Sequence, residues 1–486
     1  MKKKYGNFKV LLFLLLMVVV ATYVIKGRGD SVQYLALVDV FFDFVQSFYY
    51  FFDTLIFVLV VGGFYGFLNR VPAYKQLVRT TADKVGKRGK LFLIIVAVVF
   101  ALLSSLTGLN FLMLLFIPFF VTVILLLGYD KLVALSVTVG SILIGLLGGV
   151  FVTFKDSSSQ YVTSFSSFEK MVGLKDNWSL ATTLPKCLLL VVGVGLLIYH
   201  VVSYLKNAEG KKYKLTKSDP FYVELKDKNG KKIEESTESK VHVWPLLLCF
   251  GILVVLLVLG YLPWSDLFGI DCFNKFHTWL TGLTIGKYVV FTSLISSTLT
   301  GFGTWGGLGN YLVAIFLVCF VSVILSLIYR IKFDNAMEGF IYGIKKMIYP
   351  AILIMLAYTV LVTSYNNGFI ETIITAAGKS FGDNVIIHSL VALLGSVLNV
   401  DLYYTVAGVF STTVSSLSDK ANLSVFAVMF QSVYGVVQIV GPTSLLLLVG
   451  LSYLEVPYSS WLKYIWRFIV ELLIAIFVVL MIVSLL

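Results

Sequence analysis

The stretch Gly441-Pro442-Thr443-Ser444 interrupts a long apolar run near the C-terminus with residue types that can hold a ligand. Proline lacks a backbone donor and clashes with the preceding turn, so a helix must break at about Gly441. A break within a bilayer leaves backbone amides and carbonyls without partners, which is costly unless protein or water meets them. The freed carbonyls and hydroxyls can replace the hydration shell of a cation, and the N-terminus of the next half-helix can meet an anion. The alternative is a packing kink whose polar groups are satisfied by a neighbouring helix.

A second set of polar residues precedes this break. Asp401, beside Asn399, is the main acidic residue deep in the apolar pattern, and an intramembrane carboxylate is a functional candidate because its burial is costly. Asp401 could neutralise a bound Na⁺, carry a proton or pair with a cationic substrate; the alternative is a boundary residue that faces water. Gln431 and Gln438 share one face of the helix before the break, where they either line a site or hold helices together.

The first half of the chain repeats this order of features. The segment "SSLTGLN" at 104–110 precedes a glycine break, "GLLGGVF", at 145–151, as "GSVLNVD" at 395–401 precedes "VGPTS" at 440–444. No catalytic residue is predicted, and a Na⁺ site near Asp401 and Thr443 is one option for a metal. The predicted substrate- or ion-binding residues lie at or near these segments: Ser105, Thr107, Asn110, Asn399, Asp401, Gln438, Gly441, Thr443 and Ser444.

The composition indicates which elements must position these residues. The chain has 486 residues, of which 58% are hydrophobic and 13% charged, and its mean hydropathy is +0.93. Many apolar runs have the length that spans a bilayer as a helix. The run from Val10 to Ile25 is interpreted as a retained first span, because no Ala-x-Ala cleavage site follows it. We therefore predict an all-α polytopic membrane protein with about 12–14 helices.

Membrane topology explains the net charge of +12 better than nucleic-acid binding does. Residues 70–90 carry seven Lys or Arg against one acid, and residues 206–240 carry ten Lys against seven acids, so both segments are predicted to be cytoplasmic. The Ser-rich, balanced segment 155–179 is predicted to face outside. This map places a multi-pass protein in the cell membrane with a cytoplasmic N-terminus. Asp130 is expected to cap the helix that follows it.

The two halves are predicted to be inverted-topology repeats. The connector that begins "GGFYGFLNR" at 62–70 lies on the cytoplasmic side of this map, and its counterpart "VTSYNNGFIET" at 362–372 lies outside. Opposite orientation of matching segments, with paired broken helices and possible re-entrant hairpins, is typical of secondary transporters with sites near the midplane. The alternative is coincidence between two apolar sequences. The predicted organisation is a first membrane repeat (1–204), a cytoplasmic loop (205–241), connecting membrane segments (242–308) and a second membrane repeat (309–486).

Several short motifs occur in the order found in a known family. They are "IFVLVVGGFYGFLNR", "GYDKLVAL", "GFIYGIKKM", "NNGFIETI", "LN" at 398–399, "GPTS" and "VPYSSWLKY". In order and spacing they resemble the YfcC-type anaerobic carriers, which are related to four-carbon dicarboxylate carriers within the ion transporter superfamily. The resemblance covers most of residues 50–475, and segments 155–183 and 206–285 match weakly. It implies a secondary carrier with hairpins and broken helices around a midplane site, elevator-type movement, and dicarboxylates or basic amino acids as substrates.

Three departures from the family pattern affect the prediction of the substrate. The sequence "TGLNFLMLLFIP" stands where a pair of glutamates is expected before Pro118, and Val152–Phe154 replaces Asn-Pro-Phe. Residues 357–359 read Ala-Tyr-Thr where Ala-Arg-Gly is expected. Charged groups that could bind substrate in relatives are therefore missing, so the substrate does not carry over from the family.

The sequence favours a secondary active transporter of a small organic solute, an amino acid or a carboxylate, that is coupled to an ion or works by exchange. An antiporter of the arginine/ornithine type remains an alternative. A membrane-embedded transferase would need a catalytic cluster, and the chain has no HExxH motif and no Ser-His-Asp candidate. A permease subunit of an ATP-driven complex would need a separate ATPase, because the chain lacks a Walker motif. We expect no cofactor beyond coupling Na⁺ or H⁺, and the bilayer and the solute as partners, with a homodimer left open.

Overall fold

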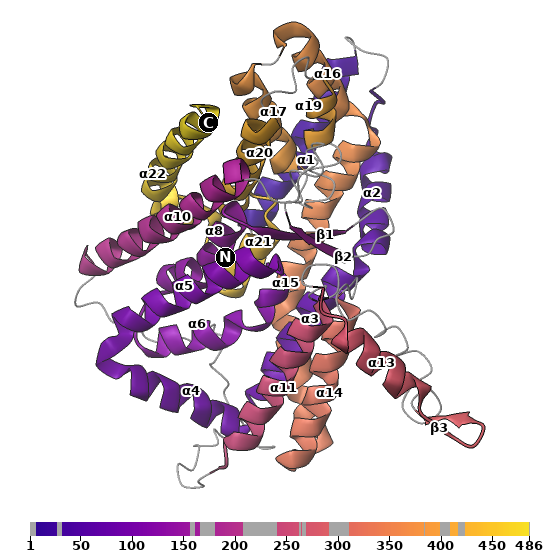
Figure 1. The fold of residues 1–486 in the computed structure, drawn as a ribbon, viewed down its shortest axis with the longest axis vertical. Coiled ribbons are helices and arrows are strands. Elements are labelled where there is room, and N and C mark those ends of the chain that lie inside the picture. The colour runs from indigo at the N-terminus through magenta and orange to yellow at the C-terminus, as the bar shows by residue number, and fades with distance from the viewer. Residues whose placement is uncertain are drawn as a thin grey trace.

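The protein is an all-α polytopic membrane protein, as the composition predicts (Figure 1). The computed structural model describes residues 6–26, 32–155, 161–165, 180–207, 241–261, 264, 269–290, 311–382, 384–398, 409–416 and 423–485. Within these residues six helical segments are long and apolar enough to cross a membrane, or seven if one bent pair counts as a span. The six are Gly6–Ile25, Pro72–Thr107, Thr182–Asn207, Phe333–Asn366, Leu423–Tyr453 and Tyr458–Ile482.

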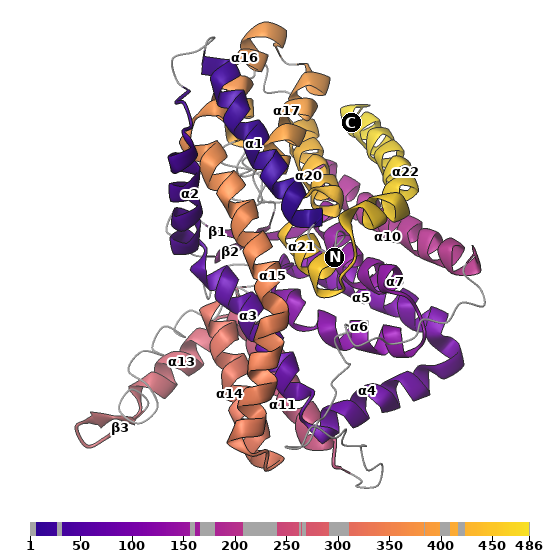
Figure 2. The ribbon, with the colours of Figure 1, turned by 180° about the vertical axis from the view of Figure 1, so that it is seen from behind.

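Helices α3 (Phe52–Leu68) and α15 (Phe333–Asn366) make the most extensive contact of any two described helices. Gly62 and Gly66 of α3 face Gly339 and Gly343 of α15, and a Cβ added to Gly62 would lie 2.8 Å from the Gly343 carbonyl oxygen. Small residues spaced by four let membrane helices approach to backbone contact. The segments "GGFYG" and "GFIYG" are therefore the two sides of one helix crossing. Around this pair lie α1 (Gly6–Lys26), α2 (Leu37–Tyr50), α11 (Trp244–Tyr261) and α14 (Leu312–Ile328) (Figure 2).

Helix α2 turns sharply into α3, with a bend of 68° between the two. It presents several apolar side chains outward, including Phe41 and Phe42, and it buries Asp43 and Ser47 on its inner side. Asn366, at the end of α15, donates a hydrogen bond of 3.4 Å to Asp43 Oδ1. A short helix with one apolar and one polar face thus lies against the long helix.

A second group of helices carries both predicted breaks. It contains α4 (Pro72–Val85), α5 (Gly89–Thr107), α6 (Ile117–Leu126), α7 (Lys131–Leu135), α8 (Ser141–Leu147), α10 (Leu180–Asn207), α20 (Leu423–Val440), α21 (Leu445–Tyr453) and α22 (Tyr458–Leu485). Asp130 Oδ1 accepts a hydrogen bond of 2.9 Å from the backbone N–H of Val133, which confirms the predicted cap of α7. A π-helical turn, Ser136–Gly140, joins α7 to α8.

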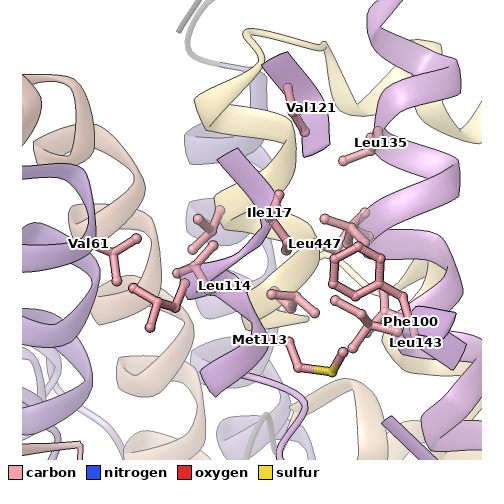
Figure 3. Packing of buried hydrophobic residues seen from close by; sticks show 14 of the residues in the cluster. Val61, Phe100, Met113, Leu114, Ile117, Val121, Leu135, Leu143 and Leu447 are labelled. Carbon is pink, nitrogen blue, oxygen red and sulfur yellow. The ribbon is translucent and has the colours of Figure 1, made fainter. Parts of the chain in front are cut away.

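A continuous apolar core links the two groups. Figure 3 shows Val61 of α3 on the side of Leu114, and Ile117 beyond Leu114 on the side of Phe100 of α5 and Leu447 of α21. Each of these side chains is at most 3% exposed. The segment between α5 and α6, with the first turn of α6, therefore packs between the α3–α15 pair and the broken helices.

Each of the two core helices is followed by a connector helix and then by one further helix. The connector α4 follows α3, and α16 (Phe369–Phe381) follows α15. Each connector ends at a glycine in the positive-φ region that L side chains avoid, Gly86 at 41° and Gly382 at 55°. Each then leads through one helix, α5 or α17 (Val385–Leu398), toward a broken segment.

The break predicted at 440–444 is confirmed as a helix interrupted in mid-course, whereas at 145–151 the helix ends and strand β1 follows instead of a second half-helix. Helix α8 ends at Leu147 and α20 ends at Val440, with α21 resuming at Leu445. The sequence did not indicate two short antiparallel hairpins, which lie outside the helices. They pair β1 (Phe151–Lys155) with β2 (Tyr161–Phe165), and β3 (Thr284–Ile285) with β4 (Tyr288–Val289). The remaining described helices are α13 (Cys272–Gly282) and α19 (Ser411–Ser416).

Candidate functional site at two broken helices

The ends of the two broken helices lie close together. Helices α8 and α20 pack where Leu147 meets Gly435, and a Cβ on Gly435 would lie 2.6 Å from the Leu147 Cα atom. A side chain at position 435 would therefore separate the helices. This crossing places the break of the first half beside the last two turns of α20.

Protein donors satisfy the carbonyls that the first break releases. Ser105 Oγ donates to Gly148 O at 2.8 Å. Gln431, buried on α20, donates through Nε2 to Gly149 O at 2.7 Å and lies 3.4 Å from Leu146 O. Ser105 and Gln431 thus hold the end of α8 from two sides, and Gln431 also joins the two halves of the chain.

The second break is satisfied mainly by α22. Trp461 Nε1 donates to Ile439 O at 3.0 Å, and the Tyr458 hydroxyl donates to Val440 O. Both donors belong to the motif "VPYSSWLKY", which the structure thereby explains. Thr443 Oγ1 donates to Val397 O at 2.7 Å, so helix α17 ends against this break.

The backbone carbonyls just described have hydrogen-bond donors. The polar groups at the breaks that have no partner are atoms of side chains. Among the buried polar atoms that have no hydrogen-bond partner within the described part of the chain, four lie at or next to the breaks: Gln438 Nε2, Ser444 Oγ, Ser396 Oγ and Gln431 Oε1. Ser444 is the N-cap residue of α21, yet its hydroxyl does not cap the helix. The first backbone N–H groups of α21 and these side chains can make hydrogen bonds to a ligand. Hydrogen bonds are strong in an otherwise apolar interior.

The other predicted residues have different surroundings. Ser104 Oγ donates to Ile142 O at 2.6 Å and contacts Asn110 Oδ1, so Asn110 is held near α8. Thr107 is half-buried and donates to Leu103 O of its own helix at 2.6 Å. The Gly441 N–H donates to Val437 O, and a Cβ at position 441 would lie 2.5 Å from that oxygen.

Two predicted residues, Asn399 and Asp401, lie outside the described residues. The chain leads toward them from Leu398, one residue after the carbonyl of Val397 that binds Thr443. Among the residues that the structure describes, no three His, Cys, Asp or Glu side chains are grouped closely enough to hold a metal ion.

Sequence reasoning missed Lys186, which is 3% exposed and is the only buried Lys or Arg within the described ranges. It lies on α10 against the first break, since a Cβ on Gly148 would lie 2.8 Å from the Lys186 carbonyl oxygen. The available signal was a lysine at the start of the apolar run "LPKCLLLVVGVG". A positive charge within a membrane helix is costly and marks a functional candidate.

A polytopic membrane protein with buried polar groups at two adjoining helix breaks has the architecture of a secondary carrier. The sequence profile of the DcuC family, described as C4-dicarboxylate anaerobic carrier, matches residues 44–485. The chain belongs to this family, which confirms the resemblance seen in its motifs. It is therefore a transporter and not an enzyme.

No curated protein matches the chain. A crystal structure of the Alcanivorax borkumensis YdaH transporter is similar over 98% of this chain and 97% of that chain, with 12% sequence identity and a TM-score of 0.42.

Proposed function

We propose that the protein carries four-carbon dicarboxylates across the cell membrane at a midplane site between the two broken helices. The observation that carries this proposal is the buried Lys186, whose backbone carbonyl packs on Gly148 of the first break, in a chain of the C4-dicarboxylate carrier family. Transport is driven by an ion gradient or by exchange.

The electrostatics of the breaks support an anionic substrate. A buried ammonium is stabilised by a carboxylate, and the N-terminus of α21 carries a partial positive charge that also favours an anion. Ser444 Oγ, at the N-cap of α21, and Gln438 Nε2, on α20 before the break, add two buried hydrogen-bond donors. A cationic substrate such as arginine would meet the like charge of Lys186, which argues against the arginine/ornithine alternative.

The repeated order of elements supports an inverted repeat. The lysine distribution assigns α4 to the cytoplasmic side and α16 to the outer side, while both connectors have the same place in their half. The broken helices of the two halves then meet from opposite faces, with the N-terminus of the chain in the cytoplasm.

For ion coupling we retain Asp401, Asn399 and Thr443. The hydrogen bond from Thr443 to Val397 supports this assignment, because it ties the break to the chain segment that leads to Asn399 and Asp401. Asp401→Asn keeps the shape of the side chain and removes its charge. We expect it to abolish gradient-driven uptake while the protein still folds; uptake that keeps its ion dependence would remove Asp401 from the site.

Uptake by proteoliposomes tests the substrate directly. Labelled succinate and labelled arginine are supplied with and without Na⁺ and pH gradients, and with either compound preloaded for exchange. We expect succinate to accumulate and unlabelled fumarate to compete with it. Accumulation of arginine without succinate would refute the proposal.

A further inference from the structure

A cavity of about 540 Å³ is lined by residues of α10 and α22. One face of the last turns of α10 and the first turns of α22 line it, with Leu132 of α7 at one side. The residues that line it are Leu132, Tyr199, His200, Ser203, Tyr204, Asn207, Ser460, Lys463, Tyr464, Trp466, Arg467 and Glu471.

The wall of this cavity is held by aromatic packing. The rings of His200 and Tyr204 meet the Tyr464 ring edge to face, at centroid distances of 4.7 and 4.9 Å. The Tyr204 hydroxyl donates to Asp130 Oδ2 at 2.6 Å. Contacts of this kind stabilise the cavity wall.

Two spanning helices end beside the cavity, which sets its depth in the bilayer. Helix α10 ends at Asn207 and α22 begins at Tyr458. Tyr199 and Trp466 are 65% and 55% exposed, and these residue types are enriched at membrane–water interfaces. Further along α22 the outward side chains are apolar, as at Val470. The cavity therefore lies at the level of the lipid headgroups.

The charges at the opening favour an anion. Lys463 and Arg467 are exposed on consecutive turns of α22, and the Arg467 guanidinium lies 5.4 Å from the centre of the Trp466 ring. Glu471 lies one further turn into the membrane and offsets one of these charges. The Ser203 and Ser460 hydroxyls supply neutral hydrogen-bond donors.

We propose that this cavity binds the phosphate of an anionic phospholipid, with the acyl chains on the apolar outer surface of α22. Lys463 and Arg467 bind the phosphate, and Trp466 and Tyr199 pack at the glycerol level. This site is separate from the transport site, and the proposal stands whichever solute is carried.

Native mass spectrometry of the full-length protein tests the site by titration with phosphatidylglycerol or phosphatidylcholine. Lys463→Gln with Arg467→Gln should lower the affinity for phosphatidylglycerol about twenty-five-fold, since each basic residue near an anionic lipid contributes roughly a factor of five. The matched control, Lys87→Gln with Arg88→Gln, removes two exposed charges before α5 and should leave the affinity unchanged. The swap Lys463→Arg with Arg467→Lys should retain binding.

Three results would overturn the proposal: an equal loss in both double variants, equal binding of phosphatidylcholine, or displacement of phosphatidylglycerol by inorganic phosphate. The last result would assign the cavity to a free anion. If the double variant does not fold, Lys463→Gln alone carries the test, and unchanged affinity in that variant would refute the lipid site.

Discussion

At the scale of single residues, Lys186 stands out as the buried basic side chain of the described ranges. An ammonium withdrawn from water is stabilised when it meets an anion, and Lys186 lies where α10 packs on the end of α8. Its neighbour across the helices is Gly148, whose missing side chain lets the backbone of α10 approach. The small residue at position 148 thus allows the close packing that buries Lys186.

Lys186→Met keeps the length of the side chain and removes its charge. We expect the KM for succinate to rise about 10- to 100-fold, because a hydrogen bond to a charged group contributes about 1.5–3 kcal/mol. Initial rates of uptake in proteoliposomes measure this. Lys379→Met, at an exposed position on α16, is the control and should leave KM unchanged. A normal KM in Lys186→Met would show that the amine has only a structural role.

Gln431 has a structural consequence that can be separated from binding. Its amide donates to Gly149 O and lies near Leu146 O, so Gln431→Leu leaves buried carbonyls without a donor. Such a loss costs about 1–3 kcal/mol. We expect a lower unfolding temperature in a thermal-shift assay, and Gln431→Glu should not restore it because a carboxylate supplies no donor. An unchanged unfolding temperature in Gln431→Leu would mean that water replaces the amide.

At the scale of elements, the break between α20 and α21 can be tested by repair. Alanine is favoured in helices over Gly by about 1 kcal/mol and over Pro by about 3 kcal/mol. A Cβ at position 441 also collides with Val437 O in the broken geometry, so Gly441→Ala with Pro442→Ala should drive the segment toward a continuous helix. We expect normal insertion into the membrane and loss of uptake. Uptake near the normal rate would mean that the break serves packing alone.

The crossing of α3 and α15 makes a second prediction at this scale. Gly343→Ala places a methyl group against the backbone of Gly62, and such overpacking costs about 1–3 kcal/mol. Gly251→Ala on α11 meets no atom within 4 Å and is the matched control. Thermal unfolding in detergent should show a lower midpoint for Gly343→Ala only. Equal midpoints would mean that the two helices can separate without loss.

The sequence was informative about these elements to different degrees. Both breaks could be predicted, because glycine and proline act on their own turn of helix. The hydrogen-bond donors to the two breaks could not be predicted. Trp461 and Tyr458, which bind the second break, come from the helix that follows it, and Gln431, which binds the first break, comes from the other half of the chain. Lys186 was missed for the same reason, since its burial depends on helices that pack only in the folded chain.

At the scale of the whole molecule, the lysine distribution predicts which loops share a side of the membrane. Residues 206–240 are expected in the cytoplasm and 155–179 outside. In a background without native cysteines, an impermeant thiol reagent added to intact cells should label Ser158→Cys but not Lys228→Cys. The reverse pattern would invert the whole map, including the assignment of α4 and α16 to opposite faces.

The hydrogen bond from Gln431 to the end of α8 also has a mechanical consequence. With Gly435 seated on Leu147, it fastens the two broken helices at two points about one turn of α20 apart. Because α8 and α20 are joined at two points, we expect them to move together as one rigid unit. We therefore expect a bound solute to travel together with the groups that hold it, and the gate that opens to either side of the membrane to be formed by other helices.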